Sequence, residues 1–189
     1  MPTPRILGHL LSMTLLLVTC TLGAFTQTTT PPAAQTPPQS MPADLAAEDK
    51  SFLLQAAEAN MAETLMGQMA EQRSNNPVIR RFAAQMVRDH GQLLTEVREL
   101  ASTKGFALPY SIDIADDAAQ QHFSSLSGDQ FDRAYMSLMV KDHGRDVAQF
   151  DHASNHAADP QVQHFAARTL PILQAHLSEA EQLEGGGGQ

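Results

Sequence analysis

Residues 74–93 read SNNPVIRRFAAQMVRDHGQL, a stretch that contains both a turn and the start of a long amphipathic helix. Asn76 is a favoured residue type at a helix N-cap, and Pro77 is favoured at the first helical position. Apolar residues then recur at the three- and four-residue steps that place side chains on one face of a helix. The pattern predicts that one helix ends just before this turn and that a second helix follows at once.

The same periodicity extends over residues 45–184 and predicts four long helices. They span about 45–73, 77–104, 127–156 and 160–183. Asp159-Pro160 repeats the cap and proline of Asn76-Pro77, so two tight turns each join an antiparallel pair of helices. The connection 105–127 is long enough to cross the bundle, and a short helix is predicted at 116–126. We therefore expect an all-α, ferritin-like four-helix bundle with one long crossover that contains a short helix.

Composition agrees with a helical fold and narrows the classes of function. Of the 189 residues, 42% are hydrophobic and only 5% are aromatic, which favours helices rich in Ala, Leu and Met over a β-sandwich. The net charge is −9 with histidine neutral. Such an acidic surface repels phosphate backbones, so we expect no nucleic-acid binding. The sequence does not identify a protein partner.

Three terminal segments lie outside the predicted bundle. Residues 1–24 combine the positive Arg5 with a short apolar run and a small residue at Ala24, which is typical of an export signal peptide. The run is too short to span a membrane, so we expect an exported mature chain without a transmembrane span. Residues 25–44 are rich in Thr, Pro and Gln, and residues 185–189 are rich in Gly. We expect both of these segments to be disordered.

Each long helix carries one metal-ligand residue type on its apolar stripe: Glu63, His90, His143 and His176. In an antiparallel hairpin, residues at equal height are symmetric about the turn. Glu63 and His90 are symmetric about the first tight turn, and His143 and His176 about the second. If the hairpins stack, the four side chains converge in one layer. A buried carboxylate and three imidazoles need partners, and a divalent metal ion would satisfy them; zinc or iron suits this set better than copper.

Three aspartates flank this layer and are further candidates for the metal site. Asp89 and Asp142 directly precede two of the histidines in the nearly identical words MVRDHG and MVKDHG. Each can orient a ligand, bridge a second metal or pair with a nearby Arg or Lys, and the orienting or pairing role is favoured. Asp146 lies one turn beyond His143 and matches Glu63 in an internal repeat, which makes it the best candidate for an additional carboxylate ligand. The competing interpretation is a metal-free, hydrogen-bonded polar layer.

The ordered series of motifs resembles the bacterial family called domain of unknown function 4142. The resemblance rests on Phe52-Leu53, Asn76-Pro77, Phe82-Ala83, Asp89-His90, Gly128, Phe131-Asp132, Tyr135, Asp142-His143, Leu170-Pro171 and His176. It covers about residues 45–183 and implies a ferritin-like fold in a periplasmic or outer-membrane protein, without implying a reaction. Di-iron ferritins carry Glu-x-x-His on two helices, and this sequence has no such spacing, so ferroxidase activity is not predicted.

Three functions are compatible with these observations. The first is metal handling or envelope stress tolerance by a bundle with a buried His/carboxylate metal site. The second is a ferritin-like oxidoreductase acting on oxygen or peroxide, which needs redox-active iron or manganese with an open coordination position. The third is a metal-free structural or interaction module of the envelope, in which the polar layer specifies helix register. The sequence alone does not decide whether the protein is an enzyme.

Overall fold

A computed structural model describes residues 44–111 and 118–186, with side chains except at 118–121. Within this part of the chain there are five helices and no strand: α1 (Ala47–Arg73), α2 (Pro77–Thr103), α3 (Ala118–Ser125), α4 (Gly128–His156) and α5 (Pro160–Gly186). None of these helices combines the length and the hydrophobicity that a membrane span needs. The predicted signal peptide, nearly all of the 25–44 linker and residues 187–189 lie outside the described residues. Helix α5 continues through Gly185 and Gly186, which the sequence pattern assigned to a disordered tail.

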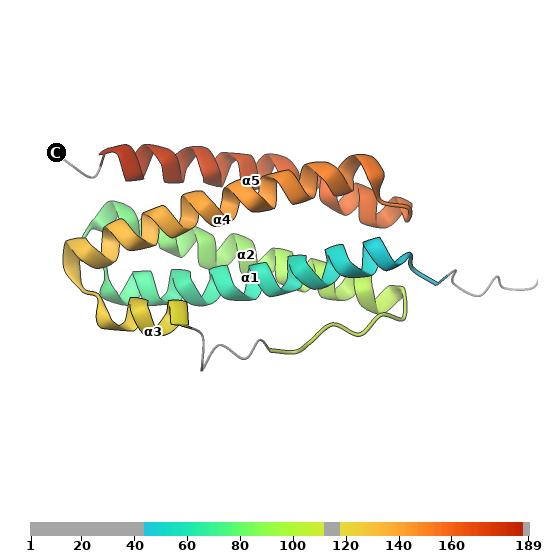
Figure 1. Ribbon diagram of the computed structural model, residues 1–189, viewed down its shortest axis with the longest axis horizontal. Coiled ribbons are helices and arrows are strands. Elements are labelled where there is room, and N and C mark those ends of the chain that lie inside the picture. Colours follow the sequence, from blue (N-terminus) through green and yellow to red (C-terminus); the bar gives the residue numbers. More distant parts are fainter. Residues whose placement is uncertain (1–43, 112–117, 187–189) are drawn as a thin grey trace, which may run out of the picture. The chain divides into compact units, whose positions relative to one another are not determined.

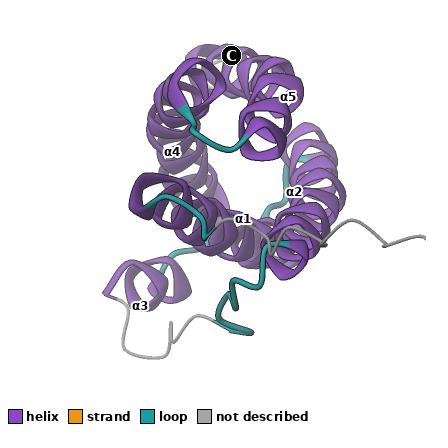
Figure 2. Ribbon diagram, turned by 90° about the vertical axis from the view of Figure 1, so that its right-hand side faces the viewer, coloured by secondary structure: helices purple, strands orange, loops and turns teal. Residues whose placement is uncertain are grey.

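The four long helices form two antiparallel hairpins that pack against each other (Figure 1). Helix α1 packs along α2, and α4 packs along α5, while α1 faces α4 and α2 faces α5 across the bundle. The connection between α2 and α4 contains α3, which packs on α4. The end-on view in Figure 2 shows the four helices surrounding one shared interior. The predicted all-α four-helix bundle, with a long crossover that contains a short helix, is confirmed.

Side-chain caps close the two tight turns. The Asn76 side chain accepts a hydrogen bond from the Val78 amide at 2.9 Å, and Asp159 accepts one from an amide in the first turn of α5 at 2.8 Å. The buried carboxylate of Asp49, on α1, accepts bonds from the amides of Ala158 and Asp159 at 3.1 and 2.8 Å. Because Asp49 belongs to the first hairpin, it also anchors the turn of the second hairpin to the first.

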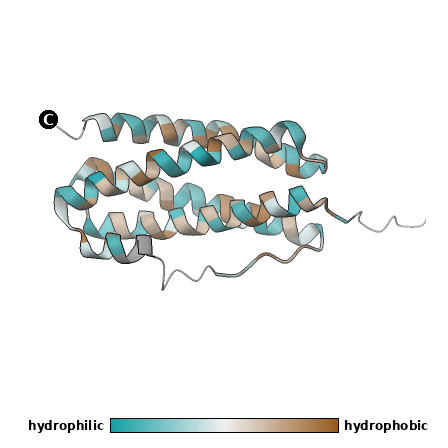
Figure 3. Cartoon of the chain, viewed as in Figure 1, coloured by the Kyte–Doolittle hydropathy of each residue, from teal (hydrophilic) through white to brown (hydrophobic). Residues whose placement is uncertain are grey.

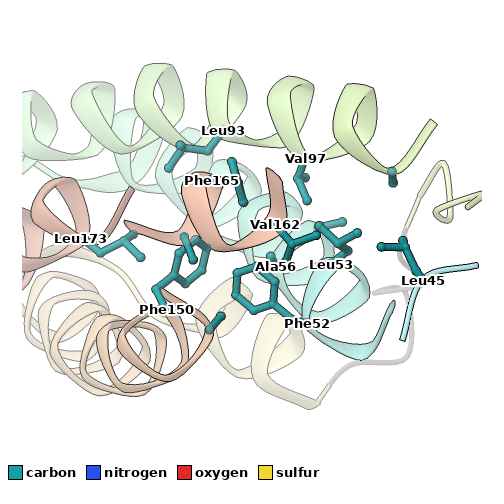
Figure 4. Close-up of a cluster of buried hydrophobic side chains, with 14 residues drawn as sticks. Leu45, Phe52, Leu53, Ala56, Leu93, Val97, Phe150, Val162, Phe165 and Leu173 are labelled. Carbon is teal, nitrogen blue, oxygen red and sulfur yellow. The ribbon is translucent and has the colours of Figure 1, made fainter. Parts of the chain in front are cut away.

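Two apolar clusters fill the interior and leave a polar layer between them. One cluster is built around Phe52, Phe150 and Phe165, whose ring centroids lie between 5.0 and 6.4 Å apart (Figure 4). The other cluster contains Phe82, Phe131, Tyr135, Met86, Met136 and Met139. Figure 3 shows hydrophobic and hydrophilic residues mixed along the long helices, and each of these helices contributes its buried residues to the interior. In each long helix the two clusters draw on opposite ends, and the helix centre supplies the polar layer.

Gly67 allows α1 and α2 to approach closely near this layer. A Cβ atom at Gly67 would lie 2.9 Å from Val87 Cγ2 and 3.0 Å from the Ala83 carbonyl oxygen. The valine can rotate away, but the backbone carbonyl cannot. The glycine is therefore required for the present spacing of the first hairpin.

Candidate metal centre

The polar layer contains the four residues that the helical stripes singled out. His90 on α2, His143 on α4 and His176 on α5 are at most 1% exposed, and Glu63 on α1 is 3% exposed. Each is buried because it continues the apolar stripe of its own helix. The fold thus places one of these side chains from every long helix in the interior, between the two apolar clusters.

The three imidazole rings form a nearly equilateral triangle. The centroid of the His90 ring lies 5.2 Å from that of His143 and 5.3 Å from that of His176, and the third side measures 5.4 Å. One ring nitrogen from each histidine lies within 4.8 Å of the other two. The closest pair is His90 Nε2 and His143 Nε2, which are 3.3 Å apart. Three nitrogens therefore converge on one point in the bundle interior.

The outer nitrogen of His90 is a hydrogen-bond donor. His90 Nδ1 lies 2.9 Å from Asn60 Oδ1. The Asn60 amide group donates to the Ala56 carbonyl at 2.7 Å, which directs its oxygen toward the ring. Because that oxygen can only accept, Nδ1 carries the proton and the inward Nε2 has a free lone pair.

The other two rings are oriented in the same manner. His143 Nδ1 lies 3.0 Å from the Met139 carbonyl oxygen, and His176 Nε2 lies 2.9 Å from Asp89 Oδ2. Both acceptors are oxygens without a proton to donate, so the remaining nitrogen of each ring is an unprotonated acceptor. That remaining nitrogen is Nε2 in His143 and Nδ1 in His176, and His176 Nδ1 is buried without a hydrogen-bond partner.

The converging atoms are thus three lone pairs with no donor among them. Two acceptor nitrogens at 3.3 Å repel each other unless a proton or a cation lies between them. In a tetrahedral zinc site with Zn–N distances of about 2.0–2.1 Å, neighbouring nitrogens lie about 3.3 Å apart. The His90–His143 pair already has this spacing, and the third nitrogen is close enough to complete the set with a small movement.

Burial keeps the three rings in the neutral form that binds metals. Desolvation lowers the pKa of His90 and the pKa of His143 to about 4, and it also lowers the pKa of His176. Near pH 7 none of these imidazoles carries the second proton that would occupy its inward nitrogen. A proton is therefore a poor substitute for a metal cation at the centre of the triangle.

Glu63 lies on the outer side of the rings. Its Oε2 is 2.8 Å from His90 Nδ1, and its Oε1 is 3.4 Å from His143 Nδ1. Neither contact has hydrogen-bond geometry, since both oxygens lack an aligned donor. Burial raises the pKa of Glu63 to about 7, and burial likewise raises the pKa of Asp146 to about 7. Glu63 thus reaches the predicted layer but does not join the converging nitrogens.

The three candidate aspartates occupy different positions around the histidines. Asp89 accepts the outer proton of His176, which is the orienting role that its sequence position suggested. Asp142 lies 3.3 Å from Arg145, and the buried Asp146 lies 3.6 Å from the same guanidinium group. Among the described residues, the converging set consists of the three histidines alone.

Two contributors to the site were not identified from the sequence. Asn60 and the Met139 carbonyl hold the outer nitrogens of His90 and His143. Asn60 is a polar residue on the inward side of its helix, three positions before Glu63. This placement could have indicated a contact with the histidines. The other histidines among the described residues, His122, His152, His156 and His164, are exposed, as predicted.

A family model matches this chain, and solved structures share its fold. The family model described as domain of unknown function (DUF4142) matches residues 34–183. A DUF305 fragment from Deinococcus radiodurans has 15% identity and a TM-score of 0.67, covering 75% of this chain and 97% of its own. CopM in its Ag-bound form has 18% identity and a TM-score of 0.61, with coverages of 75% and 98%. CopM in its Cu(I)-bound form has 16% identity, a TM-score of 0.62 and the same coverages. At these identities the likeness shows the fold alone, and no curated protein matches.

Proposed function

This chain belongs to the DUF4142 family, and from that premise we propose that it is an exported metal-handling protein. Its bundle binds one divalent transition-metal ion between His90, His143 and His176. The observation that carries this proposal is the convergence of three buried, unprotonated ring nitrogens whose outer nitrogens are each held by an oxygen acceptor. Outer acceptors of this kind are what orient histidine ligands in metal sites.

The donor set favours zinc or copper. The sequence led us to expect zinc or iron, with Glu63 among the ligands. With Glu63 on the outer side, the inner set lacks the carboxylate of the two-histidine, one-carboxylate iron sites, and imidazole nitrogen suits zinc and copper well. The related fold of CopM, which has been solved with Ag, Cu(I) and Cu(II) bound, supports a transition metal as the cargo.

Metal handling fits the surroundings of the site better than catalysis does. A catalytic metal needs an open coordination position that a substrate can reach. Three histidines leave the fourth position of a tetrahedral ion open, but the three cavities described here are lined by residues outside the triangle. We therefore place the function in metal binding, storage or transfer.

The metal content of the full-length protein tests this proposal. The protein is purified without a chelator or a histidine tag. Bound metal is then removed, Zn²⁺ or Cu²⁺ is added back, and the metal content is measured by inductively coupled plasma mass spectrometry. We expect one metal ion per chain in the wild type and none in His143→Ala. His164→Ala, which changes an exposed histidine on α5, is the control and should retain the ion. A wild-type protein that takes up no metal would leave the metal-free structural module as the function.

A further inference from the structure

We infer that Glu63 is the residue that makes the site prefer divalent over monovalent ions. It does so by providing a negative charge beside three neutral ligands. This inference rests on the proposed three-histidine site and adds a specificity-determining residue to it.

Glu63 is not needed to orient the rings. The Nδ1 proton of His90 is directed at Asn60, and that of His143 is directed at the Met139 carbonyl. The Glu63 carboxylate nevertheless lies 2.8 Å from His90 Nδ1 and 3.4 Å from His143 Nδ1. Neither of its oxygens accepts a hydrogen bond from these nitrogens. Glu63 therefore acts on the two rings through its charge and not through a hydrogen bond.

Carboxylates outnumber cationic side chains around Glu63. Among the described ion pairs, Glu63 contacts only the two imidazoles, and its side chain is 4% exposed. On α4, Asp142 and Asp146 add two carboxylates near Glu63, and the single guanidinium group of Arg145 contacts both of them. An unbalanced buried carboxylate is costly in a protein interior. A metal ion on the far side of the rings would supply the missing positive charge.

The size of this effect depends on the charge of the ion. Across an imidazole ring, Glu63 would lie about 6 Å from an ion bound at the inward nitrogens. At an effective dielectric constant of about 20, each unit of charge on the ion changes the affinity about 100-fold at this distance. A divalent ion therefore gains about 100-fold more from the carboxylate than a monovalent ion does.

The test compares Zn²⁺ with Ag⁺, two closed-shell ions that differ in charge. Dissociation constants are measured at pH 8 by competition with chelators, using the full-length wild type and the Glu63→Gln variant. Glutamine keeps the shape of the side chain and removes the charge. We expect the ratio of Zn²⁺ to Ag⁺ affinity to fall about 100-fold in the variant. Glu58→Gln, which changes an exposed carboxylate on the same helix, is the matched control and should leave the ratio unchanged.

The outcomes separate this inference from the proposed function. If the wild type binds both ions and Glu63→Gln weakens them equally, or weakens neither, the inference is overturned and the three-histidine site stands. A wild type that binds neither ion overturns the proposed function itself. If Glu63→Gln does not fold, as judged by circular dichroism, Glu63→Met fills a similar volume without charge and carries the same expectation.

Discussion

Replacing His176 by leucine should make the metal-free protein more stable and abolish metal binding. His176 Nδ1 is a buried acceptor without a partner, and such a group costs about 1–3 kcal/mol. Leucine has a similar volume and would lie one turn from the buried Leu173. The lost hydrogen bond to Asp89 offsets part of the gain, although the Asp89 side chain is 35% exposed and can turn to water. We expect a net gain of about 1 kcal/mol in the free energy of unfolding.

Zinc should reverse the order of stability of the wild type and His176→Leu. At a free zinc concentration of about 100 times the dissociation constant, binding stabilises the wild type by about 2.7 kcal/mol. His176→Leu has lost one of three ligands and should gain almost none of this. The variant should therefore be the more stable protein in EDTA and the less stable one in zinc.

Urea denaturation followed by circular dichroism, with EDTA and with zinc, measures both effects. His164→Leu, on the exposed side of α5, is the control and should respond to zinc as the wild type does. A His176→Leu variant that is less stable than the wild type in EDTA would mean that the imidazole is well satisfied without a metal. An undiminished response to zinc would remove His176 from the ligand set.

Gly67→Ala should lower the free energy of unfolding by about 1–2 kcal/mol, because its Cβ would meet a backbone carbonyl at 3.0 Å and this overlap outweighs the gain in helix propensity. Urea denaturation checks this against Gly144→Ala, where a Cβ meets nothing within 4 Å; equal effects would contradict the close approach of α1 and α2. As the pH falls from 6.5 to 4, the metal-free Glu63→Gln variant should lose stability more steeply than the wild type. The pKa values of His90 and His143 drop from 6.5 to about 4 on folding, so stability falls with pH in this window, whereas the pKa of Glu63 rises from 4.5 to about 7 and acts in the opposite direction. Denaturation in EDTA at several pH values measures the two slopes, and parallel curves would refute this assignment.

The helices and the height of the polar layer were predictable because both follow from regular spacing. The caps at Asn76 and Asp159 mark the tight turns, and symmetry about the first turn matched Glu63 with His90. In the structure, the closest atoms of this pair are 2.8 Å apart. The periodicity of the sequence predicts which face of a helix a residue occupies and how far along the helix it lies. These two quantities were enough to predict that the side chains meet.

Side-chain direction was not predictable in the same way. Whether His143 presents Nε2 or Nδ1 to the interior depends on its rotamer and on one hydrogen bond to the Met139 carbonyl. Glu63 likewise lies beside the His90 nitrogen whose proton Asn60 accepts, and no spacing in the sequence indicates this side of the ring. The contact between Asp89 and His176 joins helices of different hairpins, so it depends on how the hairpins are rotated against each other, which spacing along one helix does not report.

The converging nitrogens are shared unequally between the hairpins, since His90 comes from α1–α2 while His143 and His176 come from α4–α5. A bound ion would therefore act as a removable cross-link between two halves that are each held together by their own turn and their own close packing. Its removal would weaken the contact between the halves without removing a turn or a contact within either one.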